Sequence, residues 1–542
     1  MVHAPRRRLA RNSVSALGLS ISLGALAPVV TLSAVQPGPA PAAEAPQGRP
    51  NIVMIMADDM RKGDLRWMPK TRRLLGGEGA RFTNSFASYP LCCPARASFL
   101  TGQYTHNHHV WSHRPPYGFT SFDDDRTLPV WLRRSGYKTL FLGKYLNGYG
   151  RQPLANGNPS VRYVPPGWSQ WRGSIDGGLS KNNPKDGNTY RYRDMTLNVN
   201  GTLKPHQGQY STRLIGQQST DLIKRYAPKA APFFLYASYV APHAGRPIES
   251  DDPRGVLRND GKITHIKTPA VPSSVRGRFN AQIPKAEGLP SERDVSDKPA
   301  FIRNLPRINK REASAMREAA RQRAEAVWVL DSQVSRTIKA LSAAGELGNT
   351  LVMFTSDNGY FQGEHRMRQG KTLPYEPSLR TPLLMRGPGI PHGVNRPSPF
   401  LTIDFAPTIL DAAGANLRKS IDGQPLLGVA RHGGGGWKRP VLTETGPRST
   451  ITGAAESRPP LKLGSTTRDD KPYSVGVRTR RYLYVEHLSG EKELYDMRTD
   501  PAQVRSVVDR PAYNRDQQQL ARILSDLRHC AGAGCRRHLS SW

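Results

Sequence analysis

Four short apolar runs, each ending abruptly in polar residues, constrain the fold of this chain more than any other feature. They read NIVMIMADD, KTLFLGKY, PFFLYASYVAPH and TLVMFTSDNG, at residues 51–59, 138–145, 232–243 and 350–359. Runs of about four to eight residues rich in Val, Ile, Phe and Tyr are typical of strands that are buried on both faces of a sheet. We therefore expect these four runs to be strands of one central sheet.

Helical patterns lie between the apolar runs. The clearest spans residues 313–344, where Ala, Leu and Val recur three and four positions apart and Gly345 provides a stop signal. Strands alternating with helices predict a parallel α/β sheet, in which ligands bind beyond the carboxyl ends of the strands. All four polar clusters fall at those ends, so residues far apart in the sequence are expected to converge on one pocket.

The remaining organisation is read from composition. Residues 244–311 are rich in Pro, Arg and Asp with little periodicity, which predicts a long surface excursion that covers the cleft. Gly433–Gly436 favour a linker. Beyond it, YSVGVRTRRYLYVEH and KELYDMRTDP alternate like antiparallel strands, and YNRDQQQLARILSDLRH has a helical pattern. We expect a catalytic domain at 50–436 and a small α+β domain at 437–542.

The first 49 residues have the pattern of a signal peptide and a Pro/Ala-rich linker. A basic segment with the run Arg6–Arg8, which hints at twin-arginine export, precedes an apolar stretch broken by Ser, Gly and Pro28. The stretch is long for a signal, so an uncleaved anchor is the rival interpretation. No later run is apolar enough to cross a membrane, and we expect a secreted protein without stable membrane association.

The overall charge is unusual. The 542 residues include 78 Lys and Arg against 43 Asp and Glu, a formal charge of +35, while 37% are hydrophobic, as in a soluble globular protein. Such a charge attracts anionic polymers, sulfated ones included. A compositional bias is the alternative, because the excess is mostly arginine and is spread along the chain. No nucleic-acid-binding motif is present, so we expect no nucleic-acid partner.

The last two of the four cysteines have two interpretations. In an oxidising compartment Cys530 and Cys535 could close a short disulfide that tethers the C-terminus. A zinc site that recruits His529 or His538 is the rival.

Two polar pairs at strand ends indicate a metal site. Asp58 and Asp59 follow the first apolar run, and Asp357 and Asn358 follow the last. Each pair alone is more typical of a solvated turn. Together they offer four hard oxygen ligands at matching strand ends, which suits Ca²⁺, or Mg²⁺ with more bound water.

Adjacent Cys92 and Cys93 are poorly placed to bridge each other and need another explanation. Pro94 suits the first turn of a helix, which places Cys92 at a helix N-terminus, where an anion is favoured and a thiol pKa is lowered. The alternative is that both are small buried apolar residues, as free cysteines often are.

The order of the residues decides between these interpretations. Cys92-Cys93-Pro94-Ala95-Arg96, followed by ASFLTGQY, resembles the signature of the type I sulfatases, in which the first cysteine is oxidised to formylglycine. PNIVMIMADDM, SDNGY, GKTLPYEPSLRTPLLMRGPGI and KELYDMRTDP are similar to further motifs of that family. CCPARASFLTGQYTHNHHV, GKYLNGYG and PPGWSQW are most similar to glucosamine-6-sulfatases and extracellular heparan endosulfatases. The resemblance implies an alkaline-phosphatase-like fold, with a large, mostly parallel mixed sheet between helices and a small C-terminal antiparallel sheet.

The resemblance also implies a mechanism. A hydrated formylglycine at position 92 attacks sulfur, and its second hydroxyl then expels sulfate, with a divalent metal lowering the pKa of the attacking group. The metal ligands it implies are Asp58, Asp59, Cys92, Asp357 and Asn358. The catalytic residues it implies are Cys92, Arg96, Lys144, His243 and Lys371. Arg96 would hold the hydrate, the two lysines would neutralise sulfate oxygens, and His243 would protonate the leaving alcohol. A formylglycine-generating enzyme is the implied maturation partner.

One departure from the family pattern affects the base. Many arylsulfatases have a histidine two residues after the catalytic lysine, and this chain has Leu146 there. His109 or His365 is a candidate substitute, and Asn147 is a candidate for positioning the hydrate. We read the histidines of 106–109 chiefly as capping and packing residues.

Three functions are compatible with these features. The leading one is a sulfatase acting on a sulfated sugar or an aryl sulfate, with the sulfate position and exo or endo action left open. The others are a phosphonate or phosphodiester hydrolase of the same superfamily and a non-catalytic protein that binds sulfated polymers.

Overall fold

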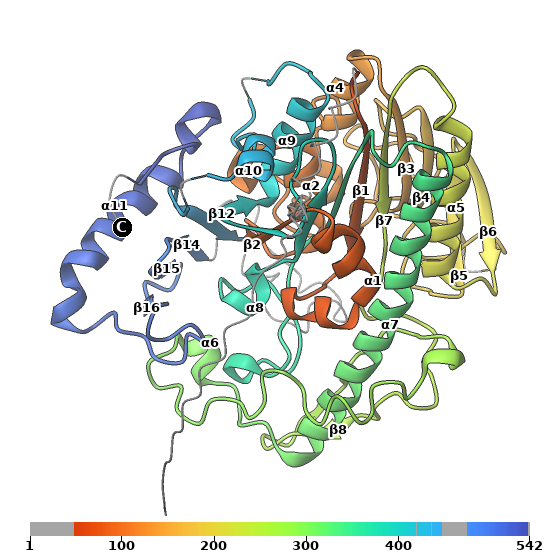
Figure 1. The fold of residues 1–542 in the computed structure, drawn as a ribbon. Coiled ribbons are helices and arrows are strands. Elements are labelled where there is room, and N and C mark those ends of the chain that lie inside the picture. Colours follow the sequence, from red (N-terminus) through yellow and green to blue (C-terminus); the bar gives the residue numbers. More distant parts are fainter. Residues whose placement is uncertain (1–47, 181, 419, 435, 447–473, 540–542) are drawn as a thin grey trace, which may run out of the picture. The chain divides into compact units, whose positions relative to one another are not determined.

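The structure is a computed structural model that describes residues 48–180, 182–418, 420–434, 436–446 and 474–539 (Figure 1). These residues belong to one compact unit, Glu44–Trp542. The predicted signal peptide and almost all of the linker that follows it lie outside the described residues and stay predictions. Within the described part of the chain, no helix combines the length and the apolar character that crossing a membrane requires.

The four apolar runs form neighbouring parallel strands at the centre of a ten-stranded sheet. These strands are β1 (Asn51–Ala57), β3 (Lys138–Lys144), β7 (Phe233–Ser238) and β10 (Thr350–Ser356). In the sheet they stand in the order β10-β1-β7-β3. Ala57 pairs with Ser356 of β10, and Met56 pairs with Ser238 of β7, so three of the strands end at the same level. The predicted parallel arrangement is confirmed.

Six further strands make the sheet a mixed one. They are β2 (Ala80–Phe86), β4 (Gln170–Ser174), β5 (Asp194–Val199), β6 (Thr202–Gln207), β11 (Leu383–Arg386) and β12 (Val394–Leu401). On one side β11 runs antiparallel to both β10 and β2, and on the other side β5 and β6 run antiparallel to their neighbours. The expected mixed, mostly parallel sheet is therefore present.

Helices cover both faces of the sheet. Ile52, Met54 and Met56 of β1 point to a core shared with α2 (Cys92–Thr101), α4 (Leu128–Arg134) and α9 (Phe405–Ala412). The alternate residues of β1 point to a second core with α5 (Ser211–Tyr226) and α7 (Lys310–Ala343). Because successive side chains of a strand face opposite ways, two apolar layers require the unbroken apolar run in the sequence. The remaining helices are α1 (Pro69–Thr71), α3 (Thr105–His108), α6 (Ala300–Arg303), α8 (Glu376–Leu379), α10 (Leu427–His432) and α11 (Asn514–Leu527).

Helix α7 agrees closely with the helix predicted over 313–344. It begins at Lys310 because Asn309 and Glu312 form a reciprocal capping box. It ends at Ala343, and Gly345 follows with φ +73°, a conformation that favours glycine.

A four-stranded antiparallel sheet follows near the C-terminus. It contains β13 (Val441–Thr445), β14 (Ser474–Arg478), β15 (Tyr482–His487) and β16 (Lys492–Asp496). Leu520, Leu524 and Leu527 of α11 pack on this sheet, and the same core includes Phe86 and Leu401 of the large sheet. The small α+β element is thus present, while the predicted boundary between residues 436 and 437 stays a prediction.

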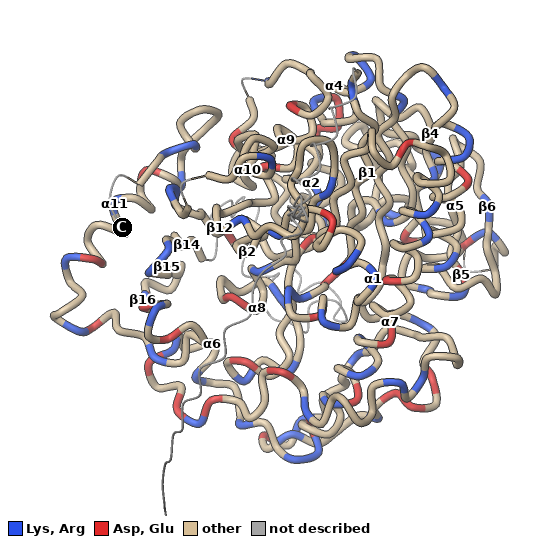
Figure 2. Tube along the Cα trace, in the orientation of Figure 1, with Lys and Arg blue, Asp and Glu red and all other residues tan. Residues whose placement is uncertain are grey.

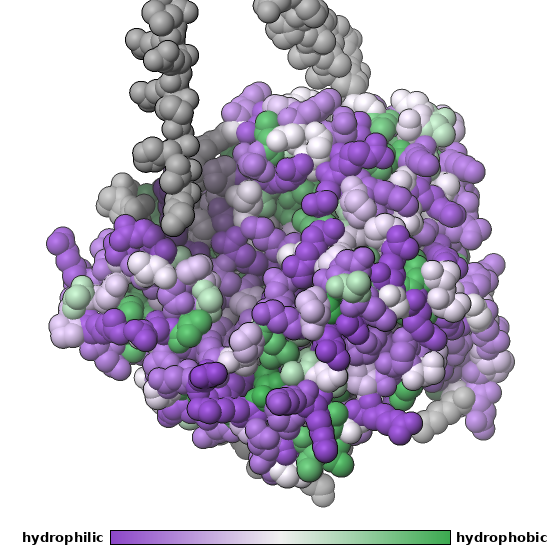
Figure 3. All heavy atoms as spheres, turned by 60° about the horizontal axis from the view of Figure 1, so that its bottom comes forward, coloured by the Kyte–Doolittle hydropathy of each residue, from purple (hydrophilic) through white to green (hydrophobic). Residues whose placement is uncertain are grey.

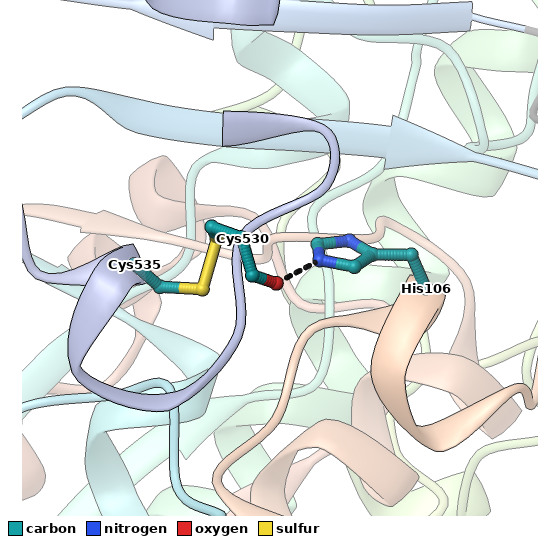
Figure 4. A group of neighbouring side chains, drawn as sticks. All are labelled: His106, Cys530 and Cys535. Carbon is teal, nitrogen blue, oxygen red and sulfur yellow. Dashed lines mark hydrogen bonds between the residues drawn. A yellow bond between two sulfur atoms is a disulfide. The ribbon is translucent and has the colours of Figure 1, made fainter. Parts of the chain in front are cut away.

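The C-terminal cysteines form the disulfide that tethers this region (Figure 4). The carbonyl oxygen of Cys530 accepts hydrogen bonds from His106 Nε2 at 2.8 Å and from Asn107 Nδ2 at 2.9 Å. The disulfide closes a short loop within the C-terminal segment, and these hydrogen bonds join that loop to α3, which follows the cysteine-bearing helix α2. Since the Cys530–Cys535 disulfide uses both sulfur atoms, the zinc interpretation with His529 or His538 is not supported.

The excursion over residues 244–311 contains little regular structure, as predicted. It holds the two-residue strands β8 (Val256–Leu257) and β9 (Ile263–Thr264) and the short helix α6. Its apolar residues Ile266, Phe279 and Ile283 pack against the first half of α7 (Figure 1). Figure 3 shows the molecule with the bottom of the Figure 1 view brought forward; hydrophilic side chains predominate on this face, with small apolar groups between them.

Candidate active site

Cys92 begins α2 and is completely buried. Its Sγ lies 3.1 Å from Asp58 Oδ1, 3.7 Å from Asp59 Oδ1 and 2.9 Å from Lys371 Nζ. These residues come from three distant parts of the chain, and the carboxyl end of β1 and the start of α2 bring them together. Convergence at the strand ends, which the apolar runs predict, therefore occurs around Cys92.

The predicted metal ligands form one cluster between β1 and β10. The backbone N–H of Asp59 donates to Asp357 Oδ1 at 3.1 Å, and Asn358 Nδ2 donates to Asp59 Oδ1 at 2.7 Å. Asp59 has φ +62°, so the chain turns sharply directly after the strand. The in-register parallel pairing of the two strands is what places the two polar pairs side by side.

Three buried cations face these carboxylates. Lys144 Nζ lies 2.5 Å from Asp58 Oδ2, Lys371 Nζ lies 2.5 Å from Asp59 Oδ1, and the Arg96 Nη2 atom lies 2.9 Å from Asp357 Oδ2. Charges this deeply buried persist only when they are paired.

The pairing shifts several pKa values. Burial alone would lower the pKa of Lys144, but the Asp58 carboxylate more than compensates and raises it. Burial likewise opposes the charged form of Arg96, and Asp357 and Asp58 raise the pKa of the guanidinium. Burial would raise the pKa of Asp357, but Arg96 and Lys144 hold it below its ordinary value. The three groups are therefore ionised at neutral pH.

The unmodified thiol of Cys92 is a poor nucleophile in these surroundings. Burial raises its pKa well above its ordinary value, and the carboxylates of Asp357 and Asp58 raise it further. The thiolate is the nucleophilic form of cysteine, and this site disfavours it. The sequence-based expectation of a lowered thiol pKa at the helix N-terminus is thus wrong for this residue, because burial, and after it the neighbouring carboxylates, raise the pKa.

His243 lies in the turn that follows β7, five residues beyond Ser238, and completes the cluster. Its Nε2 lies 3.6 Å from Asp59 Oδ2, and one ligand atom each from Asp58, Asp59, Cys92 and His243 lie within 4.8 Å of one another. Its Nδ1 lies 2.6 Å from the carbonyl oxygen of Ala244, which can only accept a hydrogen bond. Nδ1 therefore carries a proton, and Nε2 is the nitrogen that faces the pocket.

Neither histidine considered as a substitute base lies beside Cys92 in the part of the chain that the structure describes. His109 is an exposed residue that ends α3 in a left-handed conformation. His365 is buried, but its Nδ1 lies 2.6 Å from Glu292 Oε1 and its ring stacks on Tyr375. Leu146 belongs to the apolar core. The structure thus favours neither substitution and leaves His243 as the histidine within reach.

Tyr190 is a residue of the pocket that the sequence analysis missed. Its ring lies 4.6 Å from the ring of His243 and 5.0 Å from Lys144 Nζ, and its hydroxyl accepts a hydrogen bond from Asn147 Nδ2 at 2.5 Å. It lies in a turn before β5, where no strand-end pattern points to it. Only the tertiary fold brings this loop to the pocket.

Arg323 is a second missed residue, and here the sequence did contain a signal. It interrupts the apolar face of the α7 pattern, and in the structure it is buried. Its guanidinium donates to the carbonyl oxygens of Pro242 and Asp59 and lies 4.2 Å from the ring centroid of Tyr360. A buried arginine that bonds to both strand-end loops holds those loops in position.

The residues present fit a hard divalent cation. Asp58, Asp59 and Asp357 supply carboxylate oxygens, and Asn358 Oδ1 is a buried acceptor with no hydrogen-bond partner in the described structure. An unsatisfied buried oxygen is costly unless a ligand meets it. Oxygen-only ligands suit Ca²⁺ or Mg²⁺.

Fold and pocket together define a hydrolase of the alkaline-phosphatase-like class. A family model described as sulfatase matches residues 50–415, and the chain belongs to that family. It is a sulfuric ester hydrolase.

Individual relatives agree with this assignment. An arylsulfatase of Chlamydomonas reinhardtii is 29% identical over 521 residues, covering 90% of this chain and 75% of the relative. An N-acetylglucosamine-6-sulfatase of Capra hircus is 31% identical over 536 residues, covering 90% of this chain and 85% of the relative. A solved protein in complex with its substrate, D-glucosamine-2-N,6-O-disulfate, has the same fold, with a TM-score of 0.63, 23% identity and coverage of 89% of this chain and 97% of that one.

Proposed function

We propose that this chain is a secreted sulfatase that removes sulfate esters from a sulfated sugar, with formylglycine at position 92 and a divalent metal, Ca²⁺ in preference to Mg²⁺. The observation that carries the proposal is the position of Cys92, buried between two aspartates and Lys371 at the start of α2. A thiol with a raised pKa has no evident use there, whereas its oxidised form would stand between metal ligands and sulfate-binding lysines.

A divalent metal and the formylglycine would supply the central chemistry. A metal held by Asp58, Asp59, Asp357 and Asn358 would provide a positive charge that acidifies an adjacent hydroxyl, and hydrated formylglycine would provide one hydroxyl for attack on sulfur and another for sulfate release.

The chain's own residues would bind sulfate and move protons. Lys144 and Lys371, which pair with Asp58 and Asp59 beside residue 92, would neutralise the sulfate oxygens as charge develops on them. Arg96, fixed by Asp357 and by Ser238 Oγ at 2.6 Å, would hold residue 92 in place. His243 would donate its Nε2 proton to the leaving alcohol oxygen once protonated, a form that Asp59 stabilises. When Nε2 is unprotonated, it would accept a proton from residue 92. Many arylsulfatases have a histidine at the position of Leu146, and leucine cannot accept a proton.

A sulfated sugar is favoured over an aryl sulfate as the substrate. The N-acetylglucosamine-6-sulfatase of Capra hircus is among the relatives that align over nine-tenths of this chain, 31% identical and with 85% of its own length covered. The arylsulfatase of Chlamydomonas reinhardtii aligns equally widely, so aryl sulfates serve as convenient assay substrates.

The first test is the mass of the tryptic peptide Phe82–Arg96 from protein secreted by its native host. Replacement of the Cys92 sulfur by an aldehyde oxygen is expected, and a Cys93→Ala variant is the matched control that retains this change. An intact thiol at Cys92 in active protein would contradict the formylglycine proposal.

The amino-terminal sequence of the secreted protein tests removal of the signal, and co-expression with a formylglycine-generating enzyme tests the maturation partner.

The second test compares sulfate and phosphonate monoesters of the same alcohol after chelation and after return of Ca²⁺ or Mg²⁺. Sulfate release that is lost on chelation and restored best by Ca²⁺ is expected. Preferred phosphonate hydrolysis would favour the other branch of the superfamily. Binding of sulfated polymers with no hydrolysis of either ester would identify a non-catalytic binding protein.

A further inference from the structure

Two adjoining cavities lie outside the catalytic pocket, between the excursion and α7. One has a volume of about 640 Å³ and the other about 660 Å³, and Arg276 and Gly277 line both. None of the residues that surround Cys92 lines either cavity. We name the pair the arginine groove and define it by Trp67, Arg254, Arg276, Arg278, Arg311 and Trp328.

The floor of the first cavity is aromatic. Phe279 lies between two tryptophans, with ring centroids 4.7 Å from Trp67 and 6.0 Å from Trp328. Phe279 is buried, whereas both tryptophans are half-buried and present part of their rings to the cavity. The Arg278 guanidinium lies 3.9 Å from the ring centroid of Trp328. Stacked arginine and tryptophan present a flat apolar face and a cation side by side.

Most of the positive charge of the groove is not neutralised by neighbouring acidic side chains. Exposed Arg254, Arg278 and Arg311 form no ion pair with any acidic residue that the structure describes. Arg276 differs, because it pairs with Glu249 at 2.8 Å and Asp251 at 3.2 Å. Figure 2 shows Lys and Arg mixed with Asp and Glu over most of the described chain, so what distinguishes the groove is that its arginines line the same cavities as Trp67 and Trp328.

The loop that carries Arg276 and Arg278 is fixed by contacts with α7 and with residues 249–251. Glu325 of α7 is buried, and burial raises the pKa of its carboxyl to about 7, while the backbone N–H groups of Gly277 and Arg278 facing it lower that pKa in part. Arg276, through its two acidic partners, ties the same loop to residues 249–251. These contacts fix the loop that carries Arg278 without the need for a bound ligand.

Two structural elements connect the groove with the catalytic pocket. Trp67 ends the short 3-10 helix Lys62–Trp67, which follows the aspartate pair of β1. Trp328 lies on α7 five residues beyond Arg323, roughly 7.5 Å along the helix axis. Arg323 itself contacts the backbone of Asp59. The same two elements, the 3-10 helix Lys62–Trp67 and α7, therefore contribute residues both to the groove and to the surroundings of the Asp58–Asp59 pair.

We propose that the arginine groove binds a neighbouring stretch of a sulfated glycan chain and is an accessory site for polymeric substrate. The proposal rests on the proposed function, because it takes the glycan to be the substrate of the pocket. Guanidinium groups match the oxygens of sulfate with paired hydrogen bonds, and tryptophan rings pack on the flat faces of sugar rings. The occupant is thus an anionic carbohydrate rather than an acidic peptide, for which the aromatic floor has no evident use.

The test compares two charge-reversal variants with the same change in net charge. The groove variant carries Arg254→Glu, Arg278→Glu and Arg311→Glu. The control carries Arg510→Glu, Arg515→Glu and Arg522→Glu, at exposed arginines in and beside α11. Both are made in Cys92→Ala protein, so that the probe survives, and Trp328→Ala is a third variant that leaves the charge unchanged. Binding of a fluorescent heparin-type oligosaccharide is measured beside its desulfated form and an oligonucleotide of equal charge.

The groove variant is expected to weaken binding of the sulfated probe about tenfold, and the control less than about twofold. Trp328→Ala is expected to weaken it as well; because Trp328 also packs against Phe279, binding is measured at a temperature where the variant is fully folded. Equal losses in both triple variants, no loss in either, or equally groove-dependent binding of the oligonucleotide would overturn the proposal. With Cys92 restored, the groove variant is expected to raise KM for the polymer while kcat/KM for a monosaccharide sulfate stays unchanged. Failure of sulfate release by the wild-type enzyme would instead contradict the proposed function, and the binding result would stand by itself.

Discussion

At the scale of single residues, the pocket is a set of opposite charges balanced against one another around Cys92. Each carboxylate has a buried cation within 3 Å, and His243 Nε2 lies 3.6 Å from Asp59. Activity is therefore expected to depend on the residues that position these charged side chains as well as on the charged side chains themselves.

Tyr190 is such a residue, since it touches His243, Lys144 and Asn147 at once. Tyr190→Phe keeps the ring and loses only the hydroxyl that Asn147 contacts, so a reduction of kcat of about two- to threefold is expected. Tyr190→Ala also removes the ring face under Lys144, and a reduction of about tenfold or more is expected. Steady-state kinetics on an aryl sulfate measure both. Equal activity of the two variants would show that the ring does not position the lysine.

His106 leads to a prediction about stability and pH. Both its ring nitrogens face acceptors, the Glu444 carboxylate at 2.7 Å and the Cys530 carbonyl at 2.8 Å (Figure 4). Burial alone would lower the pKa of His106, but Glu444 outweighs it and raises the pKa to about 9. The folded state thus binds a proton that the unfolded chain releases near pH 6.5, and the stabilisation is complete below that pH and lost as the pH rises to about 9.

The expected loss is about 3 kcal/mol in the free energy of unfolding between pH 6.5 and 9.5. Urea unfolding at both pH values measures it. His106→Gln cannot titrate and is expected to show less of this decline, whereas His392→Gln, at an exposed histidine, is expected to behave like the wild type. The same decline in His106→Gln as in the wild type would contradict the assignment.

At the scale of elements, the ends of β1 and β10 are where sequence reasoning was most informative. Buried strands require unbroken apolar residues, and parallel strands end at one edge, so the polar pairs Asp58–Asp59 and Asp357–Asn358 and the end of β7 could be located from the apolar runs alone. The same reasoning could not place Tyr190, because its loop has no periodic pattern. Nor could it foresee the raised pKa of Cys92, which depends on distances between side chains that are hundreds of residues apart in sequence.

Gly359 shows how closely the elements at this edge approach one another. A Cβ at this position would lie 2.2 Å from the carbonyl oxygen of Pro377, and the backbone N–H of Gly359 donates to Ser378 at 2.8 Å. Gly359→Ala is expected to cost about 1–3 kcal/mol of unfolding free energy and to displace Asn358 from the cluster, which lowers sulfatase activity. Gly348→Ala, where a Cβ meets nothing within 4 Å, is the control. Thermal unfolding and activity of both variants check this, and unchanged behaviour of Gly359→Ala would show that the loop can move aside.

At the scale of the whole molecule, the large positive charge is evident from the composition, but the composition does not show what the charge is for. The catalytic cluster itself is nearly neutral, so the +35 formal charge lies elsewhere in the chain. A distributed charge of this kind acts on ligands that carry many negative charges and extend beyond the pocket.

Turnover of a sulfated polymer is therefore expected to be far more sensitive to salt than turnover of a monosaccharide sulfate. Exposed charges are screened over about 8 Å at physiological ionic strength, and each charge on the polymer that contacts the protein adds to the dependence. Between roughly 0.05 and 0.2 M salt, kcat/KM on the polymer is expected to fall about tenfold, and kcat/KM on the monosaccharide less than about twofold. Parallel kinetic series on both substrates measure the two slopes. Equal salt dependence of kcat/KM on the two substrates would mean that the charge of the chain plays no part in substrate capture and reflects only its composition. A steeper salt dependence on the polymer would mean that the protein surface, and not the pocket alone, contributes to how this sulfatase selects its substrate.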